Sequence, residues 1–354
     1  MPSTSVLRQC VSPTVLQQRT ALASEFAQAQ PFRHVVIDDF LEPSFCADIV
    51  DQFPDFDVKS AINENGQVGG KSTREKVRSL GPAYCCLDDL VQNPEFLGLI
   101  EGITGIKDLR YDPYYFGGGT HENRQGQDLD PHVDFNYHPL SRQHRRLNLI
   151  IYLNDDWRDE WGGSLQLHRD PYMPPDQDDI LTIAPLRNRC VIFETNEYSW
   201  HGFERITLPP ERQHLSRKSF ALYYYTDTRP AGETVEEHST VYVERHLPGR
   251  FREGHTLDSI DVQEIRLMFA RRDQHLKRLY RNIHRLYGEV NRQKSLNSAP
   301  HGPESSREAQ VAENSTADRL IAILRARIRE LETSTSWRIT APLRAVKRWL
   351  AGPP

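Results

Sequence analysis

The middle of this chain of 354 residues contains a series of short apolar segments with no helical pattern between them. The clearest segments are residues 146–154, 162–168, 189–195 and 217–226, and turn residues separate them. Their enrichment in β-branched and aromatic residues is typical of strands. A parallel sheet would need a helix between successive strands. The spacing therefore favours an antiparallel β-sandwich or barrel over a doubly wound α/β fold.

The flanking regions differ from this series in character. Residues 1–30 are predicted to be a polar lead-in, and the strand-containing domain is expected over residues 31–230. Residues 231–290 are expected to be a helical extension. Its apolar residues recur at steps of three and four, which is typical of coiled coils, at Leu276, Leu279, Ile283, Leu286 and Val290. Residues 291–317 are polar and predict a flexible linker, and residues 318–354 predict a coiled helix with a basic, Trp-containing tail.

Composition limits the class of protein. The formal net charge is -5, which gives no reason to expect nucleic-acid binding. The five cysteines form no CxxC pair, so reduced thiols are expected. The N-terminal residues contain no apolar signal region, and no apolar run approaches the roughly 20 residues that span a bilayer. These features predict a soluble, cytoplasmic protein.

The segment DPHVDFNYHP contains a candidate metal site. His132 and Asp134 are two residues apart, and on a strand such residues point to the same face. One imidazole and one carboxylate can then reach the same point. His201, which follows the strand of residues 189–195, would complete a facial triad with open coordination positions. This mixed nitrogen and oxygen set suits Fe(II), whereas zinc more often takes three histidines or histidine with cysteine.

A second His-x-Asp pair, His168 and Asp170, is the alternative. It lies so close to His201 in sequence that too few strands could wrap between the two halves of a site. His132 precedes most of the strand series, so the pair of His132 and Asp134 is preferred. His168 is then expected to be an exposed histidine at the end of a strand.

The open positions of such a site need a bidentate oxygen ligand, and a 2-oxoacid fits. Its distant carboxylate would need a fixed cation, for which the planar guanidinium of arginine is suited. Arg217 begins the strand of residues 217–226 and shares a face with Ser219 and Tyr223. An arginine on this face indicates a buried carboxylate ligand; the alternative is that Arg217 ends the loop and faces water.

Five segments together resemble the iron and 2-oxoglutarate dioxygenase domain of the prolyl 4-hydroxylase-like superfamily. In order they are HVVIDDFLEPSFC, DPHVD, LNLIIYLNDDWRDEWGGSLQLH, IFETNEYSWHGFERI and RKSFALYYYT, over roughly residues 34–228. The resemblance implies a mainly β fold with flanking helices around a double-stranded β-helix, or jelly roll. It also implies an oxidoreductase that uses Fe(II), 2-oxoglutarate and O2, with ascorbate as a candidate reductant. Such an enzyme hydroxylates a C–H bond and releases succinate and CO2.

The same resemblance assigns roles to individual residues. His132, Asp134 and His201 would hold the iron, Arg217 would bind the far carboxylate of 2-oxoglutarate, Tyr152 would donate a second hydrogen bond to it, and Asn148 and Leu165 would line the pocket. Related halogenases lack the carboxylate ligand, so Asp134 favours hydroxylation. The chain departs from the family in the long stretch before Arg217, which leaves Arg205 and Arg212 as alternatives.

The sequence gives less information about the primary substrate than about the metal site. The loops 60–80 and 111–131 carry no motif, and Tyr114, Tyr115 and Phe116 could equally form a substrate wall or belong to the core. A protein or prolyl hydroxylase, and a catalytically idle scaffold of the same fold, are alternatives.

The C-terminal segment ELETSTSWRITAPLRAVKRWL resembles a tail found in bacterial glycosyltransferases of cell-surface polysaccharide clusters. This resemblance implies a glycan or nucleotide-sugar substrate. It also implies glycan-assembly partners, or contact with the inner membrane surface through basic residues and Trp349. The alternative is a generic coil that forms homo-oligomers.

Overall fold

The computed structural model describes residues 5–61, 71–174, 176–245 and 247–297 of the chain. These belong to two compact units, Met1–Asp258 and Ser259–Pro354. The first unit contains every strand that the structure describes. In the second, the described residues form one long helix, α7 (Ser259–Asn297).

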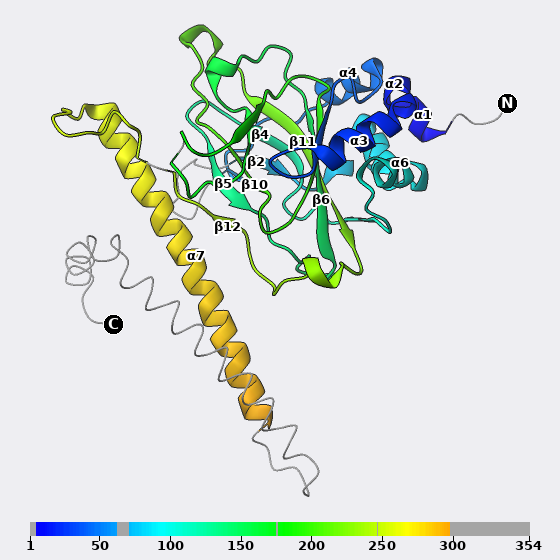
Figure 1. The fold of residues 1–354 in the computed structure, drawn as a ribbon. Coiled ribbons are helices and arrows are strands. Elements are labelled where there is room, and N and C mark those ends of the chain that lie inside the picture. Colours follow the sequence, from blue (N-terminus) through cyan, green and yellow to red (C-terminus); the bar gives the residue numbers. More distant parts are fainter. Residues whose placement is uncertain (1–4, 62–70, 175, 246, 298–354) are drawn as a thin grey trace, which may run out of the picture. The chain divides into compact units, whose positions relative to one another are not determined.

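The first unit is built on two antiparallel sheets (Figure 1). The larger contains β1 (His34–Ile37), β2 (Ser72–Arg74), β3 (Arg110–Tyr111), β4 (Gly119–Asn123), β6 (His144–Tyr152), β9 (Cys190–Glu194) and β11 (Arg217–Thr226). Its order is β1-β9-β6-β11-β4-β2, and β3 also pairs with β11. The smaller contains β5 (Leu129–Val133), β7 (Leu165–His168), β8 (Ile180–Ile183), β10 (Trp200–Phe203) and β12 (Val241–Tyr242). Its order is β12-β5-β10-β7-β8.

Alternation along the strands gives the larger sheet two different faces. On β6, Leu147 and Leu149 belong to the main apolar core, whereas Tyr152 belongs to a second buried cluster. That second cluster joins the inner faces of both sheets through Phe32, Tyr152, Leu165, Leu167, Ile183, Val191 and Phe193. The two sheets therefore pack face to face, as in the predicted double-stranded β-helix. The fold class is confirmed.

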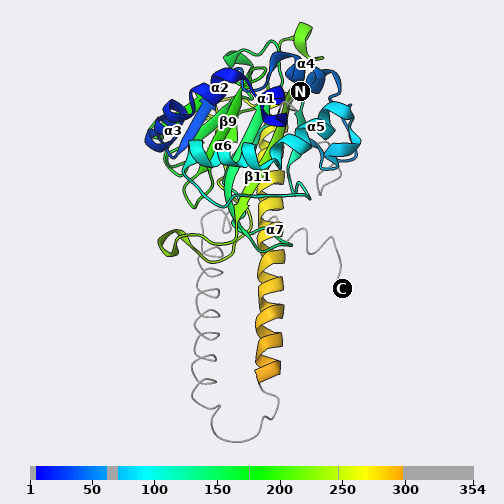
Figure 2. The same ribbon diagram turned by 90° about the vertical axis from the view of Figure 1, so that its right-hand side faces the viewer.

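Helices cover the outer face of the larger sheet (Figures 1 and 2). They are α1 (Val6–Cys10), α2 (Pro13–Gln17), α3 (Arg19–Gln28), α4 (Pro43–Asp51), α5 (Pro82–Val91) and α6 (Pro94–Thr104). Local sequence explains their limits. In α6, the Asn93 side chain accepts a hydrogen bond from the Glu95 backbone, Pro94 occupies the first turn, and Gly105 ends the helix in the left-handed conformation.

The N-terminal segment is more than a lead-in. Its three helices bury Cys10, Val15, Leu22 and Phe26 in the main core. These apolar residues are widely spaced among polar ones, so the sequence looks polar although one side of each helix packs inward. The compact unit is accordingly wider than the expected domain of residues 31–230.

The region after residue 230 differs from the predicted helical extension. It contains a short 3-10 helix, Ala231–Glu233, and then β12, which pairs Val241 with Val133 and Tyr242 with His132. The alternating VYV sequence suits a strand better than a helix. Short 3-10 helices also occur at Val77–Ser79, Asp159–Trp161 and Pro210–Arg212, the last inside the long stretch before Arg217.

Helix α7 begins later and ends later than the sequence predicts, since it runs through residues 291–297 of the expected linker. Residues 298–317 of that linker, and the tail of residues 318–354, lie outside the described residues. Coiled-coil packing of α7 stays a prediction. No helix among the described residues is long and apolar enough to cross a bilayer.

Candidate metal centre

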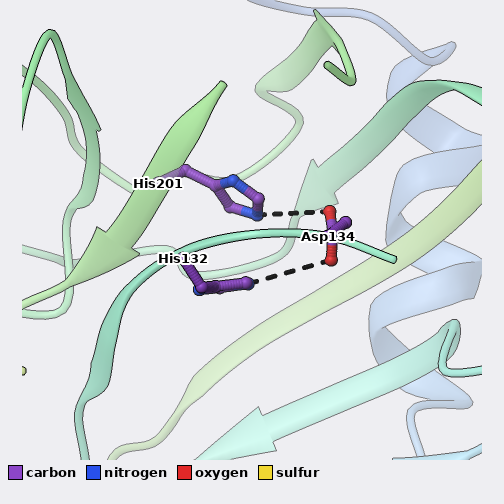
Figure 3. Close-up of side chains that lie close together, drawn as sticks. All are labelled: His132, Asp134 and His201. Carbon is purple, nitrogen blue, oxygen red and sulfur yellow. Dashed lines mark ion pairs between the residues drawn. The ribbon is translucent and has the colours of Figure 1, made fainter. Parts of the chain in front are cut away.

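Three side chains from two neighbouring strands converge at one point (Figure 3). His132 lies on β5, Asp134 follows at its end, and His201 lies on β10, directly opposite His132 in the antiparallel register. Each residue offers one ligand atom, and these atoms lie within 4.8 Å of one another. His132 Nε2 is 3.8 Å from Asp134 Oδ1, and His201 Nε2 is 3.5 Å from Asp134 Oδ2. Among the described residues this is the one such cluster.

Backbone carbonyls orient both imidazoles. His132 Nδ1 lies 2.9 Å from the Asp130 carbonyl oxygen, and His201 Nδ1 lies 2.9 Å from that of Ser199. A carbonyl only accepts, so each Nδ1 carries the proton and donates it. Each Nε2 then presents a lone pair toward Asp134. This is the tautomer that a metal ligand requires, fixed by an outer hydrogen bond.

The protonation states also suit a metal. Burial, and after it the nearby His201, together lower the pKa of His132 to about 3. Burial likewise lowers the pKa of His201. Burial alone would raise the pKa of Asp134, but Arg145 and the two imidazoles outweigh it and the pKa falls below its usual value. Two neutral imidazoles and one carboxylate are the donor set of a facial triad for non-haem Fe(II).

Arg145 and Asn148 both contact the Asp134 carboxylate and fix its orientation. Arg145 Nη2 lies 3.0 Å from Asp134 Oδ2, and Asn148 Nδ2 donates to the same oxygen at 2.8 Å. Arg145 is fully buried, donates to Asn148 Oδ1 and stacks on the Tyr223 ring at 3.6 Å. Asn148 thus contacts Asp134, the candidate carboxylate ligand, and its expected contact with 2-oxoglutarate stays a prediction.

Sequence reasoning missed Arg145 because of a register shift. Strict alternation along β6 would place Asn148 and Arg146 on one face. The pairing with β11 shifts between Tyr224 and Tyr225, so Tyr224 faces Leu147 and Tyr225 faces Arg145. The irregularity turns Arg145 inward beside Asn148, while Arg146 lies near Glu194. No local signal in the sequence marks this shift.

Arg217 is buried in the same barrel, as predicted. Its Nη2 donates to the Tyr152 hydroxyl at 3.2 Å, and its Nε donates to the Gly163 carbonyl at 2.6 Å. Its guanidinium also lies over the Phe203 ring at 4.3 Å. Burial lowers the pKa of Arg217 and raises that of Tyr152. The phenol therefore stays protonated and can donate to an anion.

Gly163 must be glycine for this arrangement. Its φ of +73° is in the left-handed region, and a Cβ there would lie 3.0 Å from Trp157 and Ile206 and 3.4 Å from Arg217 Cδ. The Gly-Gly turn thereby brings a carbonyl against the guanidinium.

The residues considered as alternatives, Arg205 and Arg212 for Arg217 and His168 for His132, interact with other acidic residues. Arg205 Nε is 3.9 Å from Asp128, and Arg212 Nη2 is 3.3 Å from Asp156. His168 is buried rather than exposed, which corrects the expectation, because its Nδ1 lies 2.7 Å from the Asp178 carboxylate. Asp178 comes from the turn that connects β7 to β8, a partner that spacing alone does not reveal.

The remaining predicted residues are distributed between core and surface. Leu165 belongs to the buried cluster that contains Tyr152, and its contact with a co-substrate stays a prediction. Tyr115 is buried at 3% exposure, whereas Tyr114 and Phe116 are 58% and 42% exposed. Tyr115 thus belongs to the core, whereas the exposure of Tyr114 and Phe116 leaves the prediction of a substrate wall open for these two. In the expected loop of residues 60–80, residues 72–74 form β2, and residues 62–70 lie outside the described part.

Residues 118–225 match the model of the 2OG-Fe(II) oxygenase superfamily. These residues form a 2OG-Fe(II) oxygenase domain. The match contains all three ligand candidates, Tyr152 and Arg217, and the family uses Fe(II), 2-oxoglutarate and O2. The matched segment is therefore similar to 2-oxoglutarate-dependent oxygenases. No curated protein matches the sequence.

Several solved structures resemble the chain at low identity. One is a prolyl hydroxylase from Trichoplax adhaerens in complex with a peptide of hypoxia inducible factor, at 16% identity and a TM-score of 0.40, covering 61% of this chain and 94% of that one. Another is a Pseudomonas putida prolyl-4-hydroxylase, at 14% identity and a TM-score of 0.38, covering 59% and 99%. The epimerase SnoN from nogalamycin biosynthesis is similar at 14% identity and a TM-score of 0.39, covering 70% and 98%.

Proposed function

We propose that this oxygenase hydroxylates a C–H bond of a cell-surface glycan or its precursor, with release of succinate and CO2. The observation that supports the reaction class is the convergence of His132, Asp134 and His201 in the same barrel as the buried pair of Arg217 and Tyr152. The glycan part rests on the resemblance of the C-terminal tail, which lies outside the described residues.

The chain's own residues have separable tasks in this reaction. The Nε2 atoms of His132 and His201 and one Asp134 oxygen would hold Fe(II), while Arg145 and Asn148 keep Asp134 ionised and oriented. When bound, the iron and 2-oxoglutarate supply the oxidising chemistry: one oxygen atom of O2 enters the substrate and the other enters succinate. The protein contributes geometry and a site shielded from water.

Arg217 would anchor the far carboxylate of 2-oxoglutarate. Its guanidinium is fixed by the Gly163 carbonyl and the Tyr152 hydroxyl, which accepts from Arg217 and keeps its own proton. That proton can be donated to the same carboxylate, so two donors would hold one anion. Charge-assisted hydrogen bonds of this kind are about twice as strong as neutral ones.

The test is succinate formation by the full chain with Fe(II), 2-oxoglutarate and ascorbate. We expect slow turnover without substrate, and stimulation by a nucleotide-sugar or isolated glycan. Stimulation by proline-containing peptides instead would replace the glycan with a protein substrate. Absence of both iron binding and turnover would mean that the fold serves as a scaffold.

The localisation and assembly of the chain are part of the same proposal. A cytoplasmic enzyme at the inner membrane surface would meet lipid-linked glycan precursors, and self-association through α7 would present several tails together. Fractionation of cells with and without residues 298–354 tests the first point, and sedimentation of the full chain tests the second.

A further inference from the structure

A third basic side chain lies at the wall of the site, outside the segment that matches the family. Lys71 immediately precedes β2, whose Thr73 pairs with His121 on β4, while His121 pairs in turn with Ser219 on β11. The Lys71 ammonium lies 3.1 Å from Nε2 and 3.4 Å from Nδ1 of the His121 ring. It also lies 3.5 Å from the Gly117 carbonyl oxygen.

A short chain of contacts connects this lysine to the metal ligands. The Gly117 carbonyl also accepts a hydrogen bond from the Tyr223 hydroxyl at 2.9 Å. The Tyr223 ring stacks on Arg145, which is paired with Asp134. The Lys71 ammonium therefore shares one wall of the barrel with the group that holds the carboxylate ligand, and it interacts with the charges of Asp134, Arg145 and Arg217.

Lys71 differs from Arg145 in what faces it, whereas Arg217, like Lys71, faces neutral groups. Arg145 has an ion pair with Asp134, whereas Lys71 has no carboxylate within ion-pair distance among the described residues. His121 cannot offset the charge, because burial and then Lys71 itself lower its pKa well below 6.5 and keep the ring neutral. Burial lowers the pKa of Lys71 to about 8, and Asp134 opposes that change. At neutral pH the lysine is thus a half-buried cation without an anionic partner among the described residues.

The charges of the expected ligands leave this cation unmatched. One carboxylate of 2-oxoglutarate is assigned to Arg217, and the other would ligate the metal. Burying a cation without a partner is costly, whereas supplying an anion recovers part of that cost. The charges of the site are therefore better balanced if one more anion binds near Lys71.

We propose that Lys71 binds an anionic group of the primary substrate, either a carboxylate or a phosphate-type ester. The inference rests on the proposed oxygenase function and specifies the class of substrate for the same site. A neutral sugar or an unmodified prolyl peptide would leave the lysine without a partner, whereas a sugar acid or a phosphorylated sugar would not. The lysine acts here as a substrate-binding residue, and the metal and 2-oxoglutarate are bound by other groups.

The test uses the full chain loaded with Mn(II) in place of Fe(II) and with 2-oxoglutarate, so that no turnover occurs. Binding of sulfate and of acetate is measured by titration calorimetry, in wild type and in Lys71→Gln. Sulfate stands for a phosphate-type ester and acetate for a carboxylate. Lys76→Gln is the matched control, because Lys76 is exposed on the same segment. Lys71→Met is a second neutral variant that suits a half-buried position if the Gln variant does not fold.

We expect wild type and Lys76→Gln to bind one of the two anions equally well. The neutral Lys71 variants should bind it at least about tenfold more weakly, as expected for loss of a charged hydrogen bond. Their affinity for 2-oxoglutarate should stay within about twofold of wild type, since Arg217 and the metal provide that binding energy.

Three results would overturn the inference. Wild type could bind neither anion, the Lys71 variants could bind it as tightly as wild type, or their affinity for 2-oxoglutarate could fall as far as that of Arg217→Ala. The last result would make Lys71 a ligand of 2-oxoglutarate instead. If the wild type does not bind Mn(II) and 2-oxoglutarate, the proposed function and this inference both fail. If the wild type binds Mn(II) and 2-oxoglutarate but neither sulfate nor acetate, only the inference fails.

Discussion

The metal-ligand end of the site and the Arg217 end are held in place by different means. At the metal end, each histidine is oriented by a carbonyl only two residues earlier in the chain. At the other end, Arg217 is oriented by Gly163 and Tyr152, which are 54 and 65 residues away in sequence. The first end is organised by local backbone geometry and the second by the packing of the two sheets.

This difference has a consequence for robustness. A strand that forms at all places its residues i and i+2 on one face, so the metal end needs only β5 and β10 in register. The Arg217 end needs a turn, a strand and a tyrosine from different parts of the chain to meet. Changes at the two ends should therefore separate metal affinity from co-substrate affinity.

The largest effect is expected from Asp134→Ala. Loss of the only carboxylate of the triad should reduce metal affinity more than about 100-fold, beyond the range for outer partners. Mn(II) binding measured by electron paramagnetic resonance checks this. Asp170→Ala, in the second His-x-Asp pair, is the matched control and should bind metal as wild type does. Equal loss in both variants would contradict the assignment of the triad.

Arg217→Ala should affect the opposite end. Removing one partner of a buried charged pair costs about 2–5 kcal/mol, so 2-oxoglutarate affinity should fall at least about 30-fold. Mn(II) affinity should be unchanged, which would show that the two ends are independent. Arg205→Ala is the control and should keep 2-oxoglutarate affinity. The reverse outcome would mean that Arg205 is the co-substrate ligand.

Asn148→Ala should have a smaller effect, and at the metal end. Asp134 would lose one hydrogen bond while keeping Arg145, so metal affinity should fall about tenfold, the lower limit for an outer partner. Calorimetric titration with Mn(II), followed by 2-oxoglutarate, distinguishes the two ends. A loss confined to 2-oxoglutarate would instead support the pocket-lining role that the sequence suggests for Asn148.

An effect no larger than that of Asn148→Ala is expected from pH, through Lys71, whose charge interacts with Asp134 at one end and with Arg217 at the other. Its pKa of about 8 is below the usual 10.5, so the ammonium loses its proton as the pH rises from 7 to 9. Among the groups that interact with it, His121 stays neutral, and the lowered pKa of Asp134 and the raised pKa of Arg145 keep both of those groups charged in this range. Arg217 and Glu75 are the other charged groups that interact with the lysine. Sulfate affinity should fall up to about tenfold. Lys71→Gln should show no such slope, and a slope that persists in that variant would exclude Lys71 as its source.

The sequence predicted the elements that depend on local pattern. Period-two alternation identified the strands and placed Arg217, Ser219 and Tyr223 on the inner face of β11, and this is where they lie. The spacing of His132 and Asp134 identified two candidate ligands, because side chains on one face of a strand recur at every second residue. The prediction of a polar lead-in over residues 1–30 underestimated that segment, since its few, widely spaced apolar residues do not reveal that its helices pack against the core.

Sequence alone determined the strand series, the fold class and the three ligand candidates, since each depends on residues a few positions apart. Tertiary structure decided the rest. An irregularity in β6 turned Arg145 toward Asp134, pairing of β2 with β4 brought Lys71 beside His121, and β12 placed Tyr242 against His132. Register shifts and edge pairings depend on the free energy of packing the whole sheet, so no local pattern in these residues could specify them.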